Sequence, residues 1–177
     1  MAWQHCPSLK AEGYCNVAVV SCFVNGAKHI PLNLKFYKPA VEFRLGKYDD
    51  GFKSKLDFAK ELITEAREQN ISFSYIAFDS WYASSDMLEF IHNQNLKFIT
   101  EIKADRRILF YNPIERKACW LQQDELVKLI REKLWHKTTV IRYKDNLLPV
   151  YSFKAKLRDC TVPVEAFVIF DKLSDED

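Results

Sequence analysis

The chain has 177 residues, a length that suits one ordinary domain or one domain carrying an insertion. Hydrophobic residues make up 48% of it and charged residues 28%; these are globular proportions, which exclude wholesale disorder. The formal net charge of +2 does not by itself indicate nucleic-acid binding, because such binding depends on charge gathered on one face.

The first predicted element is a β-hairpin within residues 16–39. Two β-rich runs meet there at Asn25 and Gly26, and both of these residues tolerate the positive φ angles of a tight hairpin turn. The second arm alternates apolar residues with mostly polar ones, which predicts one buried face. Its apolar residues are Ile30, Leu32, Leu34 and Phe36.

An amphipathic helix is predicted over residues 54–70, after a polar loop. Apolar residues recur there at helical spacing, on one side of the predicted helix. Ser54 and Asp57 resemble a capping box, in which two side chains satisfy free backbone N–H groups at the start of a helix. We therefore expect the helix to begin at this pair.

A strand, a helix and a second strand are predicted over residues 73–79, 84–94 and 96–103. The first strand is expected to be buried, and the helix to be capped by Ser84 or Ser85. The core-facing residues of this helix are Met87, Leu88 and Ile91. Together with the hairpin and first helix, these elements predict a mixed α/β sheet with right-handed crossovers.

The character of the sequence changes from about residue 104. A basic and aromatic segment leads to a short helix within residues 124–135 and to a hairpin within residues 138–157 that turns at residues 144–146. A last strand over residues 164–172 precedes an acidic end. We find no internal repeat and no low-complexity linker.

The cysteines, the histidines and the apolar runs narrow the class of protein. The five cysteines contain no C-x-x-C pair, so they predict reduced thiols rather than a disulfide framework or a zinc ribbon. The four histidines are scattered, and a metal site of His and Cys is not favoured. The apolar runs are too short to cross a bilayer and no secretory signal is evident, so we expect a cytoplasmic protein without a membrane partner.

Asp79 is the first candidate for chemistry. It stands at the predicted C-terminal end of a strand, the edge of an α/β sheet where catalytic groups usually collect. A carboxylate there can bind Mg²⁺, and two such cations can stabilise the attacking and leaving oxygens in phosphodiester cleavage. However, one Asp cannot hold two cations, and a strand-terminal Asp often closes a turn or caps the next helix. From the residues alone, both interpretations stay open.

The block that begins at Asp79 carries the most specific resemblance to a known family. The motif D-S-W-Y at residues 79–82, followed by a short helix, an apolar strand and a basic tail, resembles the block around the second catalytic aspartate of DDE transposases from bacterial insertion sequences. Residues 13–37, with a Gly-Tyr pair and a "PL…Y" strand, are similar to the family's segment between its first and second aspartates.

The resemblance implies an RNase H-like mixed α/β sheet that lacks its first strand, with a β-rich insertion after the second-aspartate βαβ unit. It implies a partial core at residues 1–103, the insertion at 104–163, and at 164–177 the return strand and the start of the helix that bears the catalytic glutamate. The first aspartate and the glutamate have no counterpart, and Asp171 or Glu176 would be poor substitutes because neither lies on the expected helix. We therefore expect a chain truncated at both ends.

The function implied by the resemblance is DNA transposition by metal-dependent phosphodiester cleavage and strand transfer. Asp79 would bind Mg²⁺ or Mn²⁺, transposon ends would be the DNA partner, and the chain alone would be inactive. The alternative is a non-catalytic DNA-binding remnant in a bacterial cytoplasm, which competes with a full-length transposase or joins it in mixed oligomers; a homodimer is also expected. A third interpretation is an unrelated α/β binding domain without a nucleic-acid role.

DNA contacts are expected from basic and aromatic residues near the same strand ends. The resemblance places Lys103, Arg106 and Arg107 where they would neutralise phosphates, although a solvated loop fits them equally well. Trp81 and Tyr82 would stack on unpaired bases, as would two later tryptophans, but core packing is the more common fate of such rings. These tryptophans are Trp120 and Trp135. The cations that share one face of the second hairpin are interpreted as solvated. They are Lys154, Lys156 and Arg158.

Overall fold

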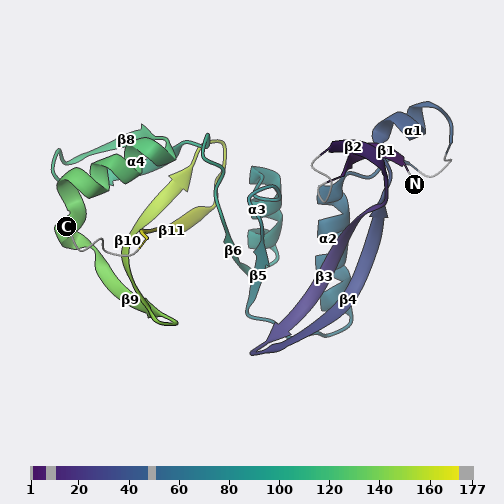
Figure 1. Cartoon of the computed structure of the whole chain (residues 1–177), viewed down its shortest axis with the longest axis horizontal. Coiled ribbons are helices and arrows are strands. Elements are labelled where there is room, and N and C mark those ends of the chain that lie inside the picture. The colour runs from purple at the N-terminus through teal and green to yellow at the C-terminus, as the bar shows by residue number, and fades with distance from the viewer. Residues whose placement is uncertain (1, 7–10, 48–50, 172–177) are drawn as a thin grey trace. The chain divides into compact units, whose positions relative to one another are not determined.

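The computed structural model describes residues 2–6, 11–47 and 51–171, with the backbone alone described for residues 2–6. The chain forms two compact units, Met1–Ile76 and Ala77–Asp177. The described strands pair into three two-stranded sheets and one five-stranded sheet, and helices accompany them in both units (Figure 1). The expectation of a mixed α/β protein is therefore confirmed at the level of fold class.

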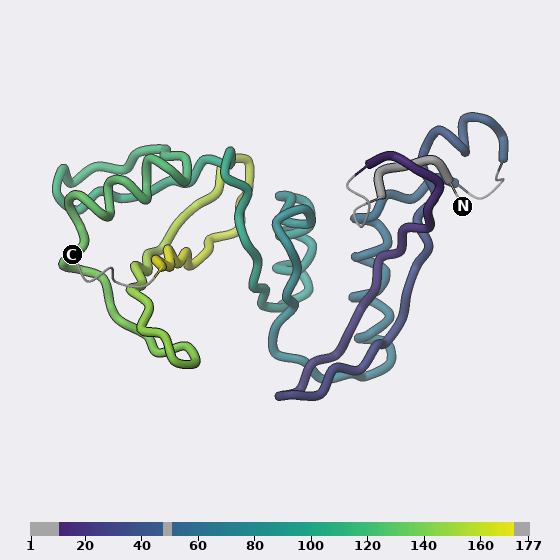
Figure 2. The backbone as a smooth tube through the Cα atoms, viewed as in Figure 1, coloured from purple at the N-terminus to yellow at the C-terminus, as the bar shows by residue number. Residues whose placement is uncertain are grey.

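The first unit contains two antiparallel hairpins and two helices. Its strands are β1 (Ala2–Cys6), β2 (Ala11–Cys15), β3 (Val17–Asn25) and β4 (Lys28–Tyr37), and its helices are α1 (Ala40–Arg44) and α2 (Lys55–Glu68). The long arms of the β3–β4 hairpin can be followed side by side in Figure 2. Gly26 takes a φ of 59° in its turn, as predicted. Asn25, in contrast, is the last residue of β3 and lies opposite Lys28.

The helix α2 begins where the sequence predicts. The Ser54 hydroxyl accepts the Asp57 N–H at 3.2 Å, and Asp57 accepts the Ser54 N–H at 2.8 Å. This reciprocal pair confirms the predicted capping box. The hydrogen bonds from the Ser54 hydroxyl and N–H also lower the pKa of Asp57, because they stabilise the ionised carboxylate.

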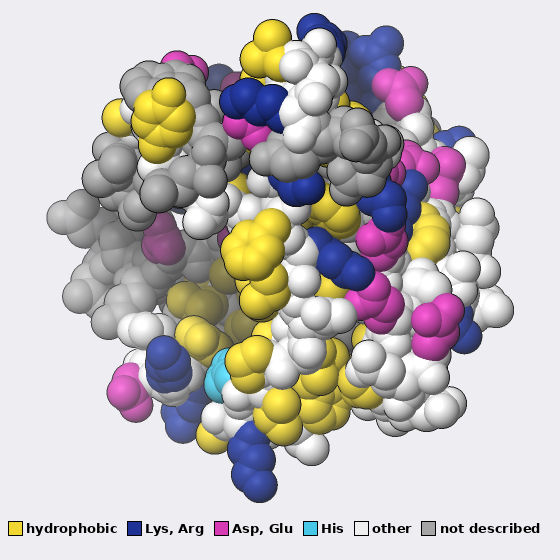
Figure 3. All heavy atoms as spheres, turned by 90° about the vertical axis from the view of Figure 1, so that its right-hand side faces the viewer, with side chains coloured by type: hydrophobic (Ala, Val, Ile, Leu, Met, Phe, Trp, Pro, Cys, Tyr) yellow, Lys and Arg dark blue, Asp and Glu magenta, His cyan; other side chains and the backbone are white. Residues whose placement is uncertain are grey.

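The predicted buried face of β4 is wrong. Leu32 has no partner in the register, which passes from Ser21 opposite Asn33 to Cys22 opposite Pro31. Such a β-bulge reverses the alternation of side chains, so Ile30 and Leu34 lie on opposite faces. Both remain exposed, as does Phe36, and Figure 3 shows hydrophobic side chains on the side of the molecule where β4 lies.

The face of β4 that carries Asn33 and Lys35 contacts α2 through polar side chains. Asn33 donates to Glu65 at 2.6 Å, and Lys35 also donates to Glu65. The hydrogen bond from Lys35 lowers the pKa of Glu65 and raises that of Lys35, because each charge stabilises the other. This polar contact lies on the face of β4 that simple alternation predicts to be solvated.

The second unit holds the largest hydrophobic core. Its helices and helical turns are α3 (Ser85–Asn93), α4 (Gln123–Leu129), the π-helical turn Ile130–Leu134 and the 3-10 turn Trp135–Lys137. Its strands are β6 (Lys97–Thr100), β7 (Ile108–Asn112), β8 (Lys117–Leu121), β9 (Thr139–Tyr143), β10 (Asn146–Leu157) and β11 (Pro163–Ile169). The five-stranded sheet runs β11-β10-β7-β8, and β9 also pairs with β10.

The core of this unit joins α3, the α4 segment and the five-stranded sheet. Leu88, Phe110, Leu126 and Ile130 are among its fully buried members. Met87, Leu88 and Ile91 are buried on α3, as predicted, and the Ser84 hydroxyl caps that helix by accepting the Met87 N–H at 3.2 Å. The β7–β8 hairpin is an element that the sequence analysis does not predict.

The strand β5 (Tyr75–Phe78) pairs with β6. It is shorter than predicted, and the expectation of a buried strand is wrong, because Tyr75 and Ala77 are exposed while Ile76 and Phe78 are only partly buried. Among the described residues, Cys15, Cys22, Cys119 and Cys160 form no disulfide. In the described part of the chain, no helix has the length and apolar content needed to span a bilayer.

Candidate functional site

Asp79 follows β5 directly and closes it with a turn. Its Oδ1 accepts the N–H of Trp81 at 2.8 Å, and its carbonyl oxygen accepts the N–H of Tyr82 at 3.1 Å. The hydroxyl of Thr100, at the end of β6, donates to the same carbonyl at 3.3 Å. The turn interpretation is therefore confirmed, and the carboxylate itself stays exposed.

The turn leaves Asp79 chemically suitable as a metal ligand. Only Oδ1 is engaged in the turn, and an exposed carboxylate oxygen is a ligand that Mg²⁺ and Mn²⁺ accept. Across residues 11–47 and 51–171, however, no three His, Cys, Asp or Glu side chains gather into a group able to hold a metal ion. The described side chains therefore fit one ligand of such a site and do not complete it. Glu176 lies outside the described residues.

Trp81 and Tyr82 form an edge-to-face pair beside Asp79. Their ring centroids are 5.0 Å apart with an interplanar angle of 75°. Trp81 remains 49% exposed, whereas Tyr82 is partly buried. Burial raises the pKa of the Tyr82 phenol, and the negative charge of Asp79 raises it further. Trp81 is thus accessible to a ligand, and Tyr82 packs against its ring.

Arg106 is tied to the loop that follows Asp79. Its guanidinium donates to the carbonyl of Ala83 and, at 2.8 Å, to the hydroxyl of Ser85. Ala83 is buried and Arg106 is partly buried, so this contact fixes the loop at the start of α3. A guanidinium has five N–H donors, so Arg106 can hold the loop and still offer donors to a ligand.

Lys103 and Arg107 are exposed beside the same loop. With Arg106 they line a pocket of about 410 Å³, and Ser80 and Trp81 line it as well. The structure therefore brings together the three predicted cations and one of the two predicted aromatic rings. Arg158 also lines the pocket, although its sequence pattern predicts a solvated side chain. No local signal identifies Arg158, because its neighbours here come from a distant part of the sequence.

The two later tryptophans have different environments. Trp135 packs edge-on against Phe170 with ring centroids 5.1 Å apart, at the edge of the hydrophobic core. Trp120 is 42% exposed and lines a second pocket of about 490 Å³. Core packing therefore accounts for Trp135, whereas Trp120 is open to solvent.

Comparison with known proteins gives one family. The protein family described as "DDE superfamily endonuclease" matches residues 1–118. These are more than half of the 177 residues, and they include Asp79 with its loop. A search of curated proteins and a search of solved structures gave no significant match. The family implies DNA as the substrate and removes the interpretation as an unrelated α/β binding domain. The chain belongs to the DDE superfamily endonuclease family.

Proposed function

We propose that the chain is part of the catalytic module of a bacterial DDE transposase, which moves DNA by metal-dependent phosphodiester cleavage and strand transfer. The family match over residues 1–118 supports this assignment. In the proposed arrangement, residues 1–103 belong to an RNase H-like core, residues 104–163 form a β-rich insertion, and residues 164–177 lead toward the helix of the catalytic glutamate. Because its substrate would be DNA, the chain would act in the cytoplasm.

The observation that carries the proposal is the geometry around Asp79. An exposed carboxylate ends a strand, and a cationic pocket that contains Trp81 begins at the next residue. When bound, Mg²⁺ or Mn²⁺ would stabilise charge on the attacking and leaving oxygens of a phosphodiester. Asp79 would contribute one ligand through Oδ2, and its turn would hold the carboxylate in place.

The residues of the pocket would position DNA against that carboxylate. Lys103, Arg106 and Arg107 would neutralise phosphates, and each such contact would release condensed counterions from the DNA. Trp81 would offer an exposed ring to a base, with Tyr82 packed against it. Arg106 would also position the loop through Ala83 and Ser85, in addition to its charge.

A second candidate function is a non-catalytic DNA-binding protein that competes with a full-length transposase or joins it in oligomers. One observation favours it: the described side chains assemble no three-membered metal group. Cleavage would then need carboxylates from outside the described residues or from another chain. In this form Asp79 would have no catalytic role, while the cationic pocket would keep its affinity for DNA.

Two measurements test these candidates. Mn²⁺ bound at Asp79 should broaden the backbone amide signals of Trp81 and Tyr82 in NMR spectra, because paramagnetic relaxation acts over short distances. Asp79→Asn should remove this broadening, while Asp105→Asn, at another exposed carboxylate of the pocket, should not. Equal broadening in the wild type and Asp79→Asn would contradict the metal-ligand role.

Nicking of supercoiled plasmid DNA in Mn²⁺ then tests whether the pure chain cleaves DNA. Asp79-dependent nicking by the pure chain would establish the catalytic function and reject the remnant. DNA binding without nicking is the result expected if the missing carboxylates come from elsewhere; Mn²⁺ broadening that depends on Asp79 would then favour the catalytic module, and its absence the remnant. Weak binding that does not respond to salt would contradict both functions.

A further inference from the structure

A row of side chains crosses the five-stranded sheet on the face away from the core. Lys156 of β10 lies opposite Pro163 of β11 on one side and opposite Leu109 of β7 on the other. Leu109 in turn lies opposite Trp120 of β8. Residues directly opposite each other in a sheet share a face, so Lys156 and the exposed ring of Trp120 belong to one surface.

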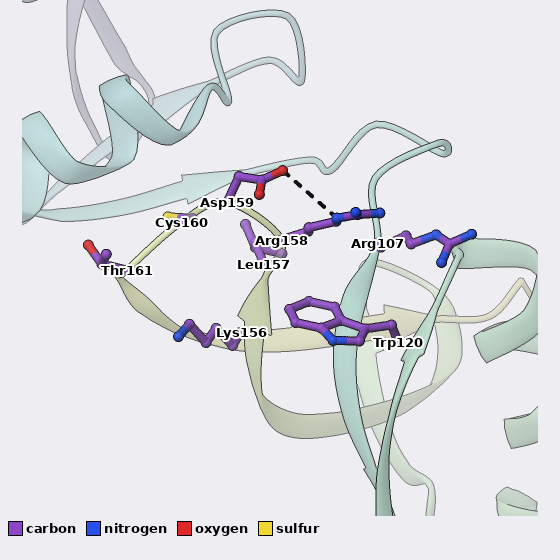
Figure 4. Close-up of a pocket in the computed structure, with 8 residues that line it drawn as sticks. All are labelled: Arg107, Trp120, Lys156, Leu157, Arg158, Asp159, Cys160 and Thr161. Atoms are coloured by element: carbon purple, nitrogen blue, oxygen red, sulfur yellow. Dashed lines mark ion pairs between the residues drawn. The ribbon is translucent and has the colours of Figure 1, made fainter.

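Two arginines extend this surface at the end of the β7–β10 ladder. The last ladder pair is Leu157 with Ile108, and just beyond it the N–H of Arg158 donates to the carbonyl of Arg107 at 3.0 Å. Both arginines line the same pocket as Lys156 and Trp120. Figure 4 shows the two side chains next to each other, with Trp120 close by.

This pairing of like charges is unfavourable unless an anion lies nearby. Like charges close together repel each other, and the two arginines are linked through their backbones at the strand ends and are both exposed. The only described ion pair of Arg158 is a 4.0 Å contact with Asp159, whose own side chain is 88% exposed. Such a contact is worth little in water and leaves the pair able to accept a stronger anion.

The row and the Asp79 loop are joined by the same residues. Arg107, Arg158 and Asp159 line both pockets, so the pocket beside Trp120 adjoins the pocket beside Trp81. Together the two pockets hold five cations and two carboxylates, an excess larger than the net charge of the whole chain. Positive charge is therefore concentrated along these two adjoining pockets, which together are called the groove below.

We propose that this groove binds the phosphate backbone of duplex DNA, with Arg107 and Arg158 acting as a pair on neighbouring phosphates and Lys156 on a further one. The proposal rests on the proposed function and extends its DNA contacts from the Asp79 loop onto the five-stranded sheet. Lys156 stands on a paired strand and the backbone of Arg158 is hydrogen-bonded to that of Arg107, so little ordering of the backbone is needed when DNA binds. Guanidinium groups also match phosphate oxygens in a two-pronged geometry.

Lys154 provides a matched control on the same strand face. It is exposed like Lys156, but it lies opposite Glu165 in the register and lines neither pocket. An acidic residue directly opposite a cation compensates its charge. Replacing Lys154 removes the same charge from the chain as replacing Lys156 and leaves the groove intact.

The test measures affinity for a fluorescent duplex by anisotropy in EDTA, between 50 and 200 mM salt. Each lost phosphate contact lowers the log–log salt slope by about 0.9, so Arg107→Ala with Arg158→Ala should reduce the slope by about 2. Adding Lys156→Ala should bring the loss to about 3, while Lys154→Ala should leave the slope within about 0.3 of wild type. Urea unfolding of each variant checks that the sheet is intact, and Arg→Gln versions replace any variant that fails to fold.

An unchanged slope in the double variant, an equal loss in Lys154→Ala, or no DNA binding by the wild-type chain would each overturn the proposal. Because EDTA removes divalent metal, the result does not depend on Asp79. The proposed function is judged separately by Mn²⁺ broadening and plasmid nicking. A wild-type chain that uses Asp79 in catalysis but binds DNA without these arginines would contradict only the groove.

Discussion

Arg106 and Arg107 are adjacent in sequence, and the structure predicts that only the replacement of Arg106 lowers the stability of the fold. Arg106 donates to the carbonyl of Ala83 and the hydroxyl of Ser85, whereas Arg107 is exposed in the groove. Hydrogen bonds from a charged donor contribute about 1.5–3 kcal/mol each when they are well protected. Because Arg106 is only partly buried, we expect Arg106→Ala to lower the free energy of unfolding by about 2 kcal/mol in total.

Urea unfolding followed by tryptophan fluorescence measures this loss. With a denaturant slope of about 2 kcal/mol per molar, the midpoint should fall by about 1 M. Arg107→Ala should move the midpoint by less than about 0.3 M. Arg106→Lys separates geometry from charge, because lysine keeps the charge but lacks the planar fork. It should lose stability and keep the salt slope for DNA. An Arg106→Ala midpoint equal to that of wild type would refute the loop-positioning role.

Three further predictions concern the second unit and the thiols. Leu88→Ala should destabilise the fold by about 2–5 kcal/mol in thermal or urea unfolding, because Leu88 is 0% exposed; a loss below about 1 kcal/mol would contradict the described core. Hydrogen bonds from the N–H and hydroxyl of Thr161 lower the pKa of Glu89 in the folded protein. The contact therefore stabilises the fold at pH values above the pKa that Glu89 has in the unfolded chain. This stabilisation is lost as the pH falls through the lower pKa of Glu89 in the folded protein. The wild-type urea midpoint should therefore fall more steeply below about pH 4.3 than that of Glu89→Gln, and parallel curves would reject the contact. Cys22 is exposed and Cys160 is buried, so a thiol reagent should modify Cys22 first and reach Cys160 only on unfolding, as mass spectrometry of labelled peptides can check.

The local elements follow from signals that lie within a few residues of one another. The Ser54–Asp57 capping box and the turn at Gly26 act through neighbouring backbone groups, so their structure is readable from the sequence. The β7–β8 hairpin has a weaker local signal, the pair Asn112-Pro113, which is typical of turns. The Asn112 Oδ1 accepts the N–H of Ile114 at 3.0 Å in that turn. The turn also contains Arg116 at a φ of 53°, a conformation that favours glycine, so the sequence indicates the turn more clearly than the pairing of the two strands.

The bulge at Leu32 shows how one residue changes a whole face. Alternation in the sequence predicts that Ile30 and Leu34 share a buried face, and an unpaired residue between them places them on opposite faces. A bulge depends on the partner strand as well as on the strand that carries it. The sequence pattern of one strand therefore predicts that the strand exists better than it predicts which side chains of the strand are buried.

The candidate site divides in the same way. The sequence by itself determined Asp79, its motif and the cations next to it, because they lie in one continuous block whose turn and cap are local. Only the tertiary structure decided that Arg106 holds the loop and that Arg107 lies beside Arg158. The physical reason is that strand register joins residues far apart in the chain, and the charge at one point of a sheet depends on every strand that meets there.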